Sequence, residues 1–352
     1  EQAVPAVRQA PQLTPGIASW YATAIPFCGI AQPVLGKTVA GRPIKLEGNP
    51  QHPMSAGTCD AFTQAAILQL YDPDRSQAPR FKGRETSWDE VRGALARQRL
   101  MLDTSRGKGL HIVCGASSSP TLGRQLDTLR RRWPEARLYH AESFAETEAL
   151  RTSERVFGQP LQARRYLQNA EVLVCLEDDP LGSGPRQTPL QQGWAERRRQ
   201  AAQGQGAALS FVAESIPTLT GAAATHRLAI APSRLPDLTL ALSRALGENV
   251  ADQPRLSARQ LEWVEAAATA LKAHPGRGLI CVGMQAATDV QAQVMRLNQR
   301  LGAHGQTLDW QAPTLLGYER GQFWASLEQL AQQLAAGNVS QLLLLDCNPL
   351  QA

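Results

Sequence analysis

Cysteine is the residue type in this chain that could bind a metal or carry out thiol chemistry. The chain has six of them, Cys28, Cys59, Cys114, Cys175, Cys281 and Cys347, and no two form a Cys-x2-Cys pair. Ligands of local metal sites are closely spaced along the chain, so the sequence predicts no compact metal site. The last four cysteines lie in or at the end of short apolar runs, which predicts small buried side chains.

The segment around Cys28 and Cys59 has a more specific pattern. It reads I-P-F-C-G-I-A-Q from Ile25 to Gln32, then G-R-P-I-K-L-E-G-N-P from Gly41 to Pro50. It resembles the amino-terminal iron–sulfur segment of the molybdopterin oxidoreductases, where the pattern is Cys-x2-Cys-x3-Cys, a similar Gly-Arg-Pro run and a fourth Cys. On that pattern Cys28 and Cys59 stand at the second and fourth cysteines, and Ile25 and Gln32 stand at the first and third.

The residue types at these four vestigial positions decide whether a cluster fits. A four-iron cluster is normally held by four thiolates. Isoleucine has no lone pair, and the neutral glutamine amide is a hard, weak ligand for iron. The resemblance therefore implies a retained frame without its cluster, and it leaves open a disulfide between Cys28 and Cys59 in an oxidising compartment.

Other positions that the active family uses are also changed. Active members carry Lys or Arg two residues after the fourth cysteine, where this chain has Ala61. They place a metal-ligating Cys, selenocysteine or Ser in a motif that is missing from 143–161. The turn 177–184, E-D-D-P-L-G-S-G, resembles the family's Gly-x-Asn-Pro turn but has Asp179 in place of Asn, whereas 346–349 keeps Asn-Pro. The resemblance thus implies no catalytic, cofactor-binding or metal-binding residue in this chain.

This combination resembles the molybdopterin-like region of the B subunit of alternative complex III, a quinol-oxidising respiratory complex. The residues that support it beyond the first segment are 70–76, 118–121, 214–221 and 348–349. That family implies export by a twin-arginine signal to the periplasmic face of the cytoplasmic membrane and no molybdenum cofactor. It implies as partners a ferredoxin-like iron–sulfur module, multihaem and monohaem c-type cytochromes and polytopic quinol-oxidising membrane subunits. Because the iron–sulfur module normally follows in the same protein, the chain is expected to be a split subunit or a fragment.

Periodicity predicts the elements that would position these residues. Short apolar strands alternate with amphipathic helices from Leu110 onward, which predicts mainly parallel sheets covered by helices. Before that, a hairpin with strands 35–38 and 43–47 and a helix at 62–71 predict a small β-rich lobe. The predicted organisation is an extended tail 1–20, a degenerate iron–sulfur-type lobe 21–85, and two α/β lobes, 86–225 and 226–352, in a molybdopterin oxidoreductase-like fold.

The predicted elements of the α/β region fall into a regular series. Strands are expected at 111–114, 136–140, 171–176, 207–212, 278–282 and 341–345; helices are expected at 120–132, 143–156, 190–202, 236–246, 258–273, 286–301 and 323–335. Ser87 and Glu90 form a capping-box pattern at the start of an earlier helix. The strand ends at 172–180 and 342–349 resemble each other, which indicates a weak internal repeat.

Further features allow alternative functions. The loop 114–120 could bind an anion at a helix amino terminus, although Ser119 before Pro120 is also an ordinary cap. The carboxylates of 177–179 could act as acids, although strand ends commonly carry them. Six scattered histidines predict structural roles. The net charge of +5 and the Arg clusters 130–132 and 197–199 predict solvated helix faces rather than nucleic-acid binding.

Three classes of function remain from the sequence. The first is a cofactor-free structural subunit of a membrane-attached respiratory complex. The second is an active molybdopterin oxidoreductase fragment, and the third is a thiol-redox or small-anion binding protein that uses Cys28 and Cys59. No run of apolar residues is long enough to predict a spanning helix.

Overall fold

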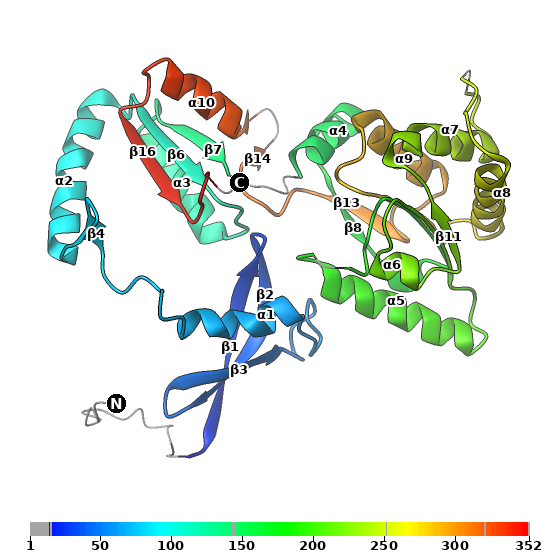
Figure 1. The fold of residues 1–352 in the computed structure, drawn as a ribbon, viewed down its shortest axis with the longest axis horizontal. Coiled ribbons are helices and arrows are strands. Elements are labelled where there is room, and N and C mark those ends of the chain that lie inside the picture. The colour runs from blue at the N-terminus through cyan, green and yellow to red at the C-terminus, as the bar shows by residue number, and fades with distance from the viewer. Residues whose placement is uncertain are drawn as a thin grey trace. The chain divides into compact units, whose positions relative to one another are not determined.

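The protein is represented by a computed structural model that describes residues 14, 16–141, 146–182, 184–250, 252–319 and 322–350. It divides into two compact units, Glu1–Leu110 with Arg124–Ala136, and His111–Gly123 with Arg137–Ala352 (Figure 1). Most of the predicted tail 1–20, and the first residues of the helix predicted at 143–156, lie outside the described residues.

The first unit contains a three-stranded antiparallel sheet. Its strands, in spatial order, are β1 (Ala18–Phe27), β2 (Ile30–Val39) and β3 (Arg42–Gly48). Both connections are two-residue turns with positive φ at each residue, namely 45° at Cys28 and 75° at Gly29, then 48° at Ala40 and 78° at Gly41. This is the backbone of type I′ hairpin turns, which matches the right-handed twist of the strands. The hairpin predicted around Ala40-Gly41 is confirmed, whereas β1 was not predicted.

Helices complete the first unit. The predicted helix at 62–71 is α1 (Ala61–Ala65) followed directly by a 3-10 helix (Ala66–Leu70). After the short pair β4 (Arg80–Phe81) and β5 (Arg84–Glu85), α2 (Trp88–Ser105) begins at a capping box formed by Ser87 and Glu90, as predicted. Asp103 of α2 accepts hydrogen bonds from Arg132 and Trp133, which ties the end of α3 (Pro120–Arg132) to α2.

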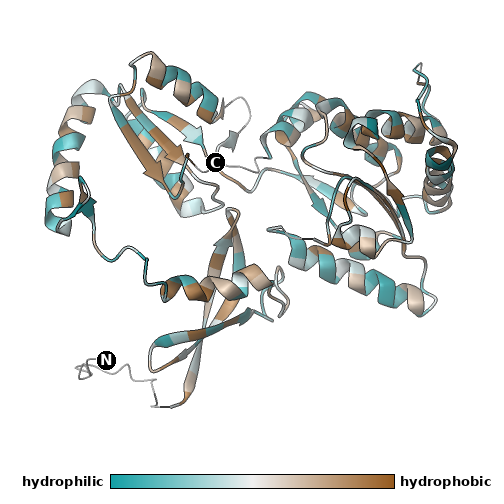
Figure 2. Cartoon of the chain, viewed as in Figure 1, coloured by the Kyte–Doolittle hydropathy of each residue, from teal (hydrophilic) through white to brown (hydrophobic). Residues whose placement is uncertain are grey.

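One sheet of the second unit has the strand order β16-β6-β7. Its members are β6 (Leu110–Cys114), β7 (Arg137–His140) and β16 (Gln341–Leu345), and β6 runs parallel to β7. Helix α10 (Leu327–Ala335) contributes Leu330 to a small core with Val113 and Tyr139. The residues of β16 are mostly leucine, which gives this strand its hydrophobic colour (Figure 2).

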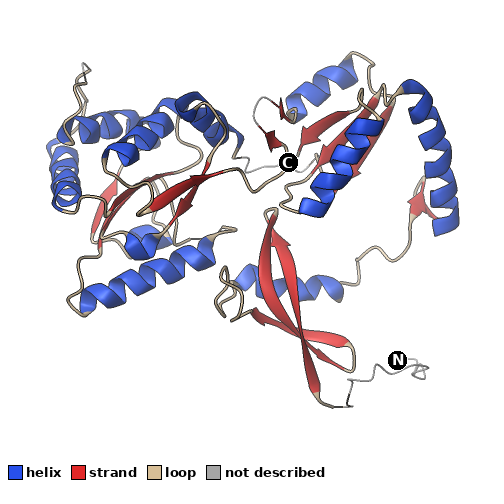
Figure 3. Ribbon diagram, turned by 180° about the vertical axis from the view of Figure 1, so that it is seen from behind, coloured by secondary structure: helices blue, strands red, loops and turns tan. Residues whose placement is uncertain are grey.

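The larger sheet of the second unit is wholly parallel and has the order β11-β10-β9-β12. Its strands are β9 (Val172–Leu176), β10 (Leu209–Glu214), β11 (His226–Ala229) and β12 (Gly278–Val282). The helices of this region are α4 (Thr147–Phe157), α5 (Gln187–Ala202), α6 (Leu219–Ala222), α7 (Leu235–Ala245), α8 (Ala258–Ala273) and α9 (Thr288–Arg300). Helices lie on both faces of the sheet (Figure 3), as expected for parallel strands.

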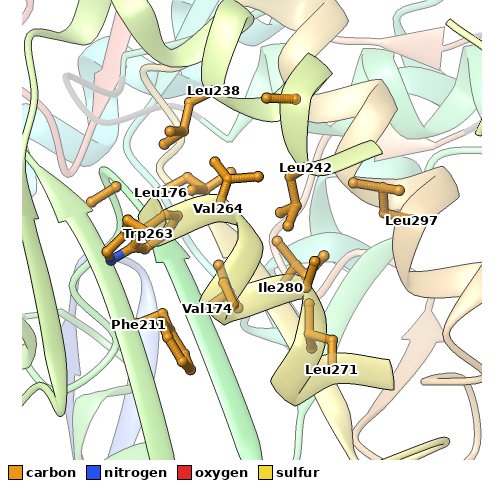
Figure 4. Packing of buried hydrophobic residues seen from close by; sticks show 14 of the residues in the cluster. Val174, Leu176, Phe211, Leu238, Leu242, Trp263, Val264, Leu271, Ile280 and Leu297 are labelled. Carbon is orange, nitrogen blue, oxygen red and sulfur yellow. The ribbon is translucent and has the colours of Figure 1, made fainter. Parts of the chain in front are cut away.

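Side chains of alternate strand residues pack into two separate hydrophobic cores, one on each face of the sheet. On one face, Val174 and Ile280 pack with Leu238, Leu242 and other residues of α7, α8 and α9 (Figure 4). On the other face, Leu173 packs with Trp194 of α5 in a cluster that also holds both cysteines of the sheet. Because side chains alternate along a strand, a continuous apolar run such as 172–176 can fill both cores.

Two further pairs of short strands lie outside these sheets. Strand β8 (Gln162–Arg165) pairs antiparallel with β13 (Leu308–Gln311), and β14 (Tyr318–Glu319) pairs with β15 (Gln322–Phe323). The helix predicted at 323–335 is therefore shorter than expected and begins at Leu327. No helix in the part of the chain that the structure describes is long and apolar enough to cross a membrane.

The mixed α/β class is confirmed: an antiparallel sheet is followed by parallel sheets with helices. The two sheets of the second unit each combine strands from before and after residue 225, because β12 lies beside β9 and β16 lies beside β6. Sheet membership therefore does not follow the predicted ranges 86–225 and 226–352. Those ranges, and the molybdopterin oxidoreductase-like architecture, stay predictions.

Candidate functional site

The four vestigial positions lie around the β1–β2 hairpin and the start of α1. Ile25 and Gln32 are direct partners across β1 and β2, and Cys28 lies in the turn between them. Gln32 is buried, and its amide Nε2 donates to the carbonyl of Ile30 at 3.4 Å. Cys28 is exposed. The hairpin therefore brings Ile25, Cys28 and Gln32 together. At the position of the family's third cysteine it has the hydrogen-bonded amide of Gln32.

Close backbone packing holds the fourth position, Cys59. A Cβ on Gly48 would lie 2.1 Å from the carbonyl oxygen of Thr58, so only glycine permits this approach of β3 to the segment before Cys59. Asp60 then caps α1 by accepting from the backbone N–H of Thr63 at 2.9 Å. Burial, helped by the nearby charge of Asp60, raises the pKa of Cys59 to about 11.

An aromatic contact joins the two parts of this frame. Phe27 precedes the turn cysteine and Phe62 lies in the first turn of α1, and their rings stack with centroids 5.3 Å apart. Such a pair contributes about 0.5–1.5 kcal/mol beyond the area that it buries. The lobe is thus held by apolar and backbone contacts that need no metal.

The residues present do not fit a four-thiolate iron–sulfur cluster. Two of the four positions carry thiols, and the buried amide of Gln32 already binds a backbone carbonyl. Ala61, where the pattern of the active enzymes has Lys or Arg, is the first residue of α1 and offers only a methyl group. Within the described ranges, no group of three or more His, Cys, Asp or Glu side chains is placed to hold a metal ion. His52 accepts from the backbone N–H of Met54 at 3.2 Å, in keeping with a structural role.

The raised pKa of Cys59 predicts slow alkylation. Because burial raises the pKa of Cys59 to about 11, its thiolate fraction at pH 8 is about a hundredfold lower than that of an ordinary cysteine. The greater nucleophilicity of a more basic thiolate recovers about tenfold. We therefore expect iodoacetamide to modify Cys59 about tenfold more slowly in the folded protein than in urea. The rate should climb about tenfold per pH unit from pH 8 to 10, as followed by peptide mass spectrometry.

The same experiment tests the predicted disulfide. The pairing of Cys28 with Cys59 in an oxidising compartment stays a prediction. If neither cysteine reacts until a reductant is added, they are joined. A Cys59 rate that stops rising near pH 9 would contradict the raised pKa.

The predicted anion loop is occupied by contacts of the protein itself. Ser119 Oγ accepts from the backbone N–H of Leu122 at 3.3 Å, which is the ordinary cap of α3. Ser117 Oγ accepts from Ser119 N–H at 3.2 Å. The close approach of the Asp346 carbonyl to Gly115, 2.1 Å from a built Cβ, closes the start of the loop. These contacts favour the structural interpretation over an anion site.

The acidic turn after β9 is likewise bound by neighbouring side chains. Asp178 pairs with Arg165 of β8 at 2.5 Å. Asp179 Oδ1 accepts from the backbone N–H of Thr220 at 2.9 Å and from the hydroxyl of the same residue. Asp179 stands where the family pattern has a neutral Asn, and its negative charge is stabilised by Thr220 of α6. Both carboxylates have structural partners, so the turn is a weak candidate for acid–base chemistry.

The predicted internal repeat has a structural counterpart. Glu177 after β9 and Asp346 after β16 both have φ of 49°. The N–H of Gly283 donates to Leu176 at 3.0 Å, and that of Gly115 donates to Leu345 at 2.9 Å. In both places a glycine lets the neighbouring strand end approach the acidic residue's carbonyl. The ends of the pairs β9–β12 and β16–β6 are thus built in the same way.

A buried carboxylate in 214–221 was not predicted as a site residue. Glu214, 1% exposed, pairs with Arg227 and accepts from the hydroxyl of Thr218 at 2.6 Å. A Cβ at position 221 would lie 1.9 Å from the Glu214 Oε1 atom, so only glycine fits there. The only signal in the sequence was a glutamate at a strand end followed by Thr and Gly. These contacts indicate a structural role, in which Glu214 joins β10 to β11 and to the start of α6.

Two expectations about side chains are wrong. Arg197 was expected on a solvated helix face, but it is 3% exposed and donates to the carbonyl of Gln205. Its guanidinium thus binds the chain just beyond the end of α5. Cys347 was expected to be buried, but it is half-buried because it lies two residues beyond β16. The burial predicted for Cys114, Cys175 and Cys281 is confirmed.

The comparisons with known proteins give one partial relative. The chain is 30% identical over 90 residues to the menaquinone reductase, molybdopterin-binding-like subunit of Nitratidesulfovibrio vulgaris. The match covers 24% of this chain and 13% of that subunit. No family model matches the chain. The similarity indicates a distant relation to a molybdopterin-binding-like subunit of a respiratory quinone reductase complex.

Proposed function

We propose that this chain is a cofactor-free structural subunit of a membrane-attached respiratory complex that passes electrons from quinol to cytochrome c or an oxidase, of the alternative complex III type. Its partners are a ferredoxin-like iron–sulfur module, c-type cytochromes and quinol-oxidising membrane subunits, on the periplasmic face of the membrane. The chain positions these partners and carries no iron–sulfur cluster, haem or molybdenum centre of its own.

The observation that carries the proposal is the set of residue types at the vestigial positions of the β1–β2 hairpin. Ile25 and Gln32 face each other in the ladder where two thiolates are needed, and the lobe is closed by the stack of Phe27 on Phe62. The partial similarity to a molybdopterin-binding-like subunit supports the same class of complex. A frame that folds through its own packing but lacks ligands suits a scaffold rather than an electron carrier.

The rival thiol-redox function has less support. A reactive cysteine needs a populated thiolate, and its pKa is lowered by nearby positive charge. Cys59 has the opposite environment, since burial and Asp60 raise its pKa to about 11. A dithiol carrier built on Cys28 and Cys59 would therefore react slowly near neutral pH.

Metal analysis of the purified native complex tests the proposal. We expect no stoichiometric molybdenum or tungsten. We also expect every iron–sulfur signal in electron paramagnetic resonance to remain when Cys28 and Cys59 are both replaced by Ala. Loss of one cluster signal in the Cys28→Ala/Cys59→Ala complex, or stoichiometric molybdenum, would show that the chain carries a cofactor. Retention of the other subunits on the variant complex is the control for assembly.

A further inference from the structure

Two buried cysteines lie side by side on β9 and on the edge strand β12 of the larger parallel sheet. Cys281 of β12 is the direct ladder partner of Cys175 of β9. Partners on neighbouring strands point to the same face, and both side chains belong to the cluster that packs with Trp194. Neighbouring strands lie about 4.8 Å apart, which is inside the Cα separation of about 4.4–6.8 Å that a disulfide spans.

Polar contacts make the two thiols unequal. Arg165, which pairs with Asp178 at 2.5 Å, places a positive charge near Cys281. The hydrogen bond from Cys175 and the charge of Arg165 lower the pKa of Cys281, whereas burial raises the pKa of Cys175. One member of the pair is thus the better thiolate, and the other is a protonated neighbour within reach.

We propose that Cys175 and Cys281 form an oxidisable dithiol that closes to a disulfide across β9 and β12, with Cys281 as the attacking sulfur and hydrogen peroxide as the class of oxidant. The Cys281 thiolate attacks one peroxide oxygen, the O–O bond breaks, and Cys281 sulfenic acid and hydroxide form. Cys175 then attacks the sulfenic sulfur and releases its oxygen as water. Overall two thiols and one peroxide give one disulfide and two waters.

The environment favours a small oxidant. Both sulfurs are enclosed by the core, and their polar neighbours, Arg165 and Asp178, are the partly exposed groups at its edge, with side chains 25% and 18% exposed. The bond would join strands 106 positions apart in sequence, and the segment between them contains β10, β11 and α5 to α8. Closing so long a loop restricts the unfolded chain and stabilises the sheet. This inference does not depend on the proposed function.

Mass spectrometry on the full chain tests the proposal. After treatment with hydrogen peroxide, unfolding and alkylation, we expect a peptide that links Cys175 to Cys281 as the main disulfide product and a higher midpoint of thermal unfolding. The Cys175→Ala variant should accumulate Cys281 sulfenic acid, trapped by dimedone. The Cys281→Ala variant should leave Cys175 a thiol. The matched control Cys114→Ala changes another buried cysteine and should keep the link.

Two results would overturn the inference. One is a native chain in which exposed Cys28 is oxidised while Cys175 and Cys281 stay thiols. The other is an equal rate of oxidation in the Arg165→Gln variant, which should be several-fold slower if the guanidinium supports the Cys281 thiolate. Circular dichroism of each variant before treatment confirms folding, and the linked peptide of the native chain requires no substitution at all.

Discussion

Replacing Glu214 by Ala is expected to lower the free energy of unfolding of the larger sheet by about 3 kcal/mol. The carboxylate is 1% exposed, and removing it leaves Arg227 and the hydroxyl of Thr218 without their acceptor. Loss of one partner from a buried ion pair typically costs about 3–5 kcal/mol. The lower end applies because the Arg227 side chain is 34% exposed and regains water.

Urea denaturation together with hydrogen exchange of peptides from β9 to β12 measures this effect. The Glu214→Gln variant keeps the shape and one acceptor oxygen, so we expect about half the loss. The matched control is Glu196→Ala, which breaks an exposed pair with Arg199 on α5 and should cost less than about 0.5 kcal/mol. Equal losses of unfolding free energy for Glu214→Ala and Glu196→Ala would show that the buried contacts of Glu214 stabilise the sheet no more than an exposed ion pair does.

The elements that the sequence predicts well are those with strong local signals. Helices α3 and α8 and strands β12 and β16 have the predicted bounds, because caps and apolar runs mark both ends. Strands β8 and β11 were missed because Q-A-R-R and H-R-L-A are short and polar. Strand β1 was missed since A-S-W-Y-A-T-A-I-P-F lacks alternation. Such strands form only because neighbouring strands supply their hydrogen bonds.

The long-range pairings had no local signal. Nothing in the run 278–282 indicates that β12 lies beside β9, about a hundred residues earlier, or that β16 lies beside β6. The contact of Thr220 with Asp179 has the same origin, since it joins segments that are far apart in sequence. The resemblance marked both segments as informative, but only the structure shows that one stabilises the charge of the other.

The four vestigial positions were named from the resemblance, whereas the hairpin that holds three of them was not predicted, because β1 was missed. The two-residue turn at Cys28 and Gly29 places Ile25 opposite Gln32 and Cys28 between them. The approach of Cys59 could not be predicted, since it depends on Gly48 contacting the backbone of Thr58. That contact explains how the lobe keeps its form while the ligand set is incomplete.

Restoring two thiolates is expected to produce the largest change in metal content. In the Ile25→Cys/Gln32→Cys variant, anaerobic treatment with iron and sulfide should load about four irons per chain, whereas the native chain should load none. Opposed residues in an antiparallel pair lie about 4.5–5.5 Å apart, so the two new thiols would flank Cys28 on one hairpin. Iron analysis and electron paramagnetic resonance of the reduced sample measure the result.

The serine pair Ile25→Ser/Gln32→Ser is the matched control, because it makes the same two positions small and polar without adding a thiolate. If the cysteine variant folds, as judged by circular dichroism, and still binds no iron, the hairpin is not a former cluster site and the family interpretation of this lobe fails. If the native chain binds iron through Cys28 and Cys59, the cofactor-free proposal fails instead. Because each outcome removes a different claim, this substitution separates the ancestry of the site from its present function.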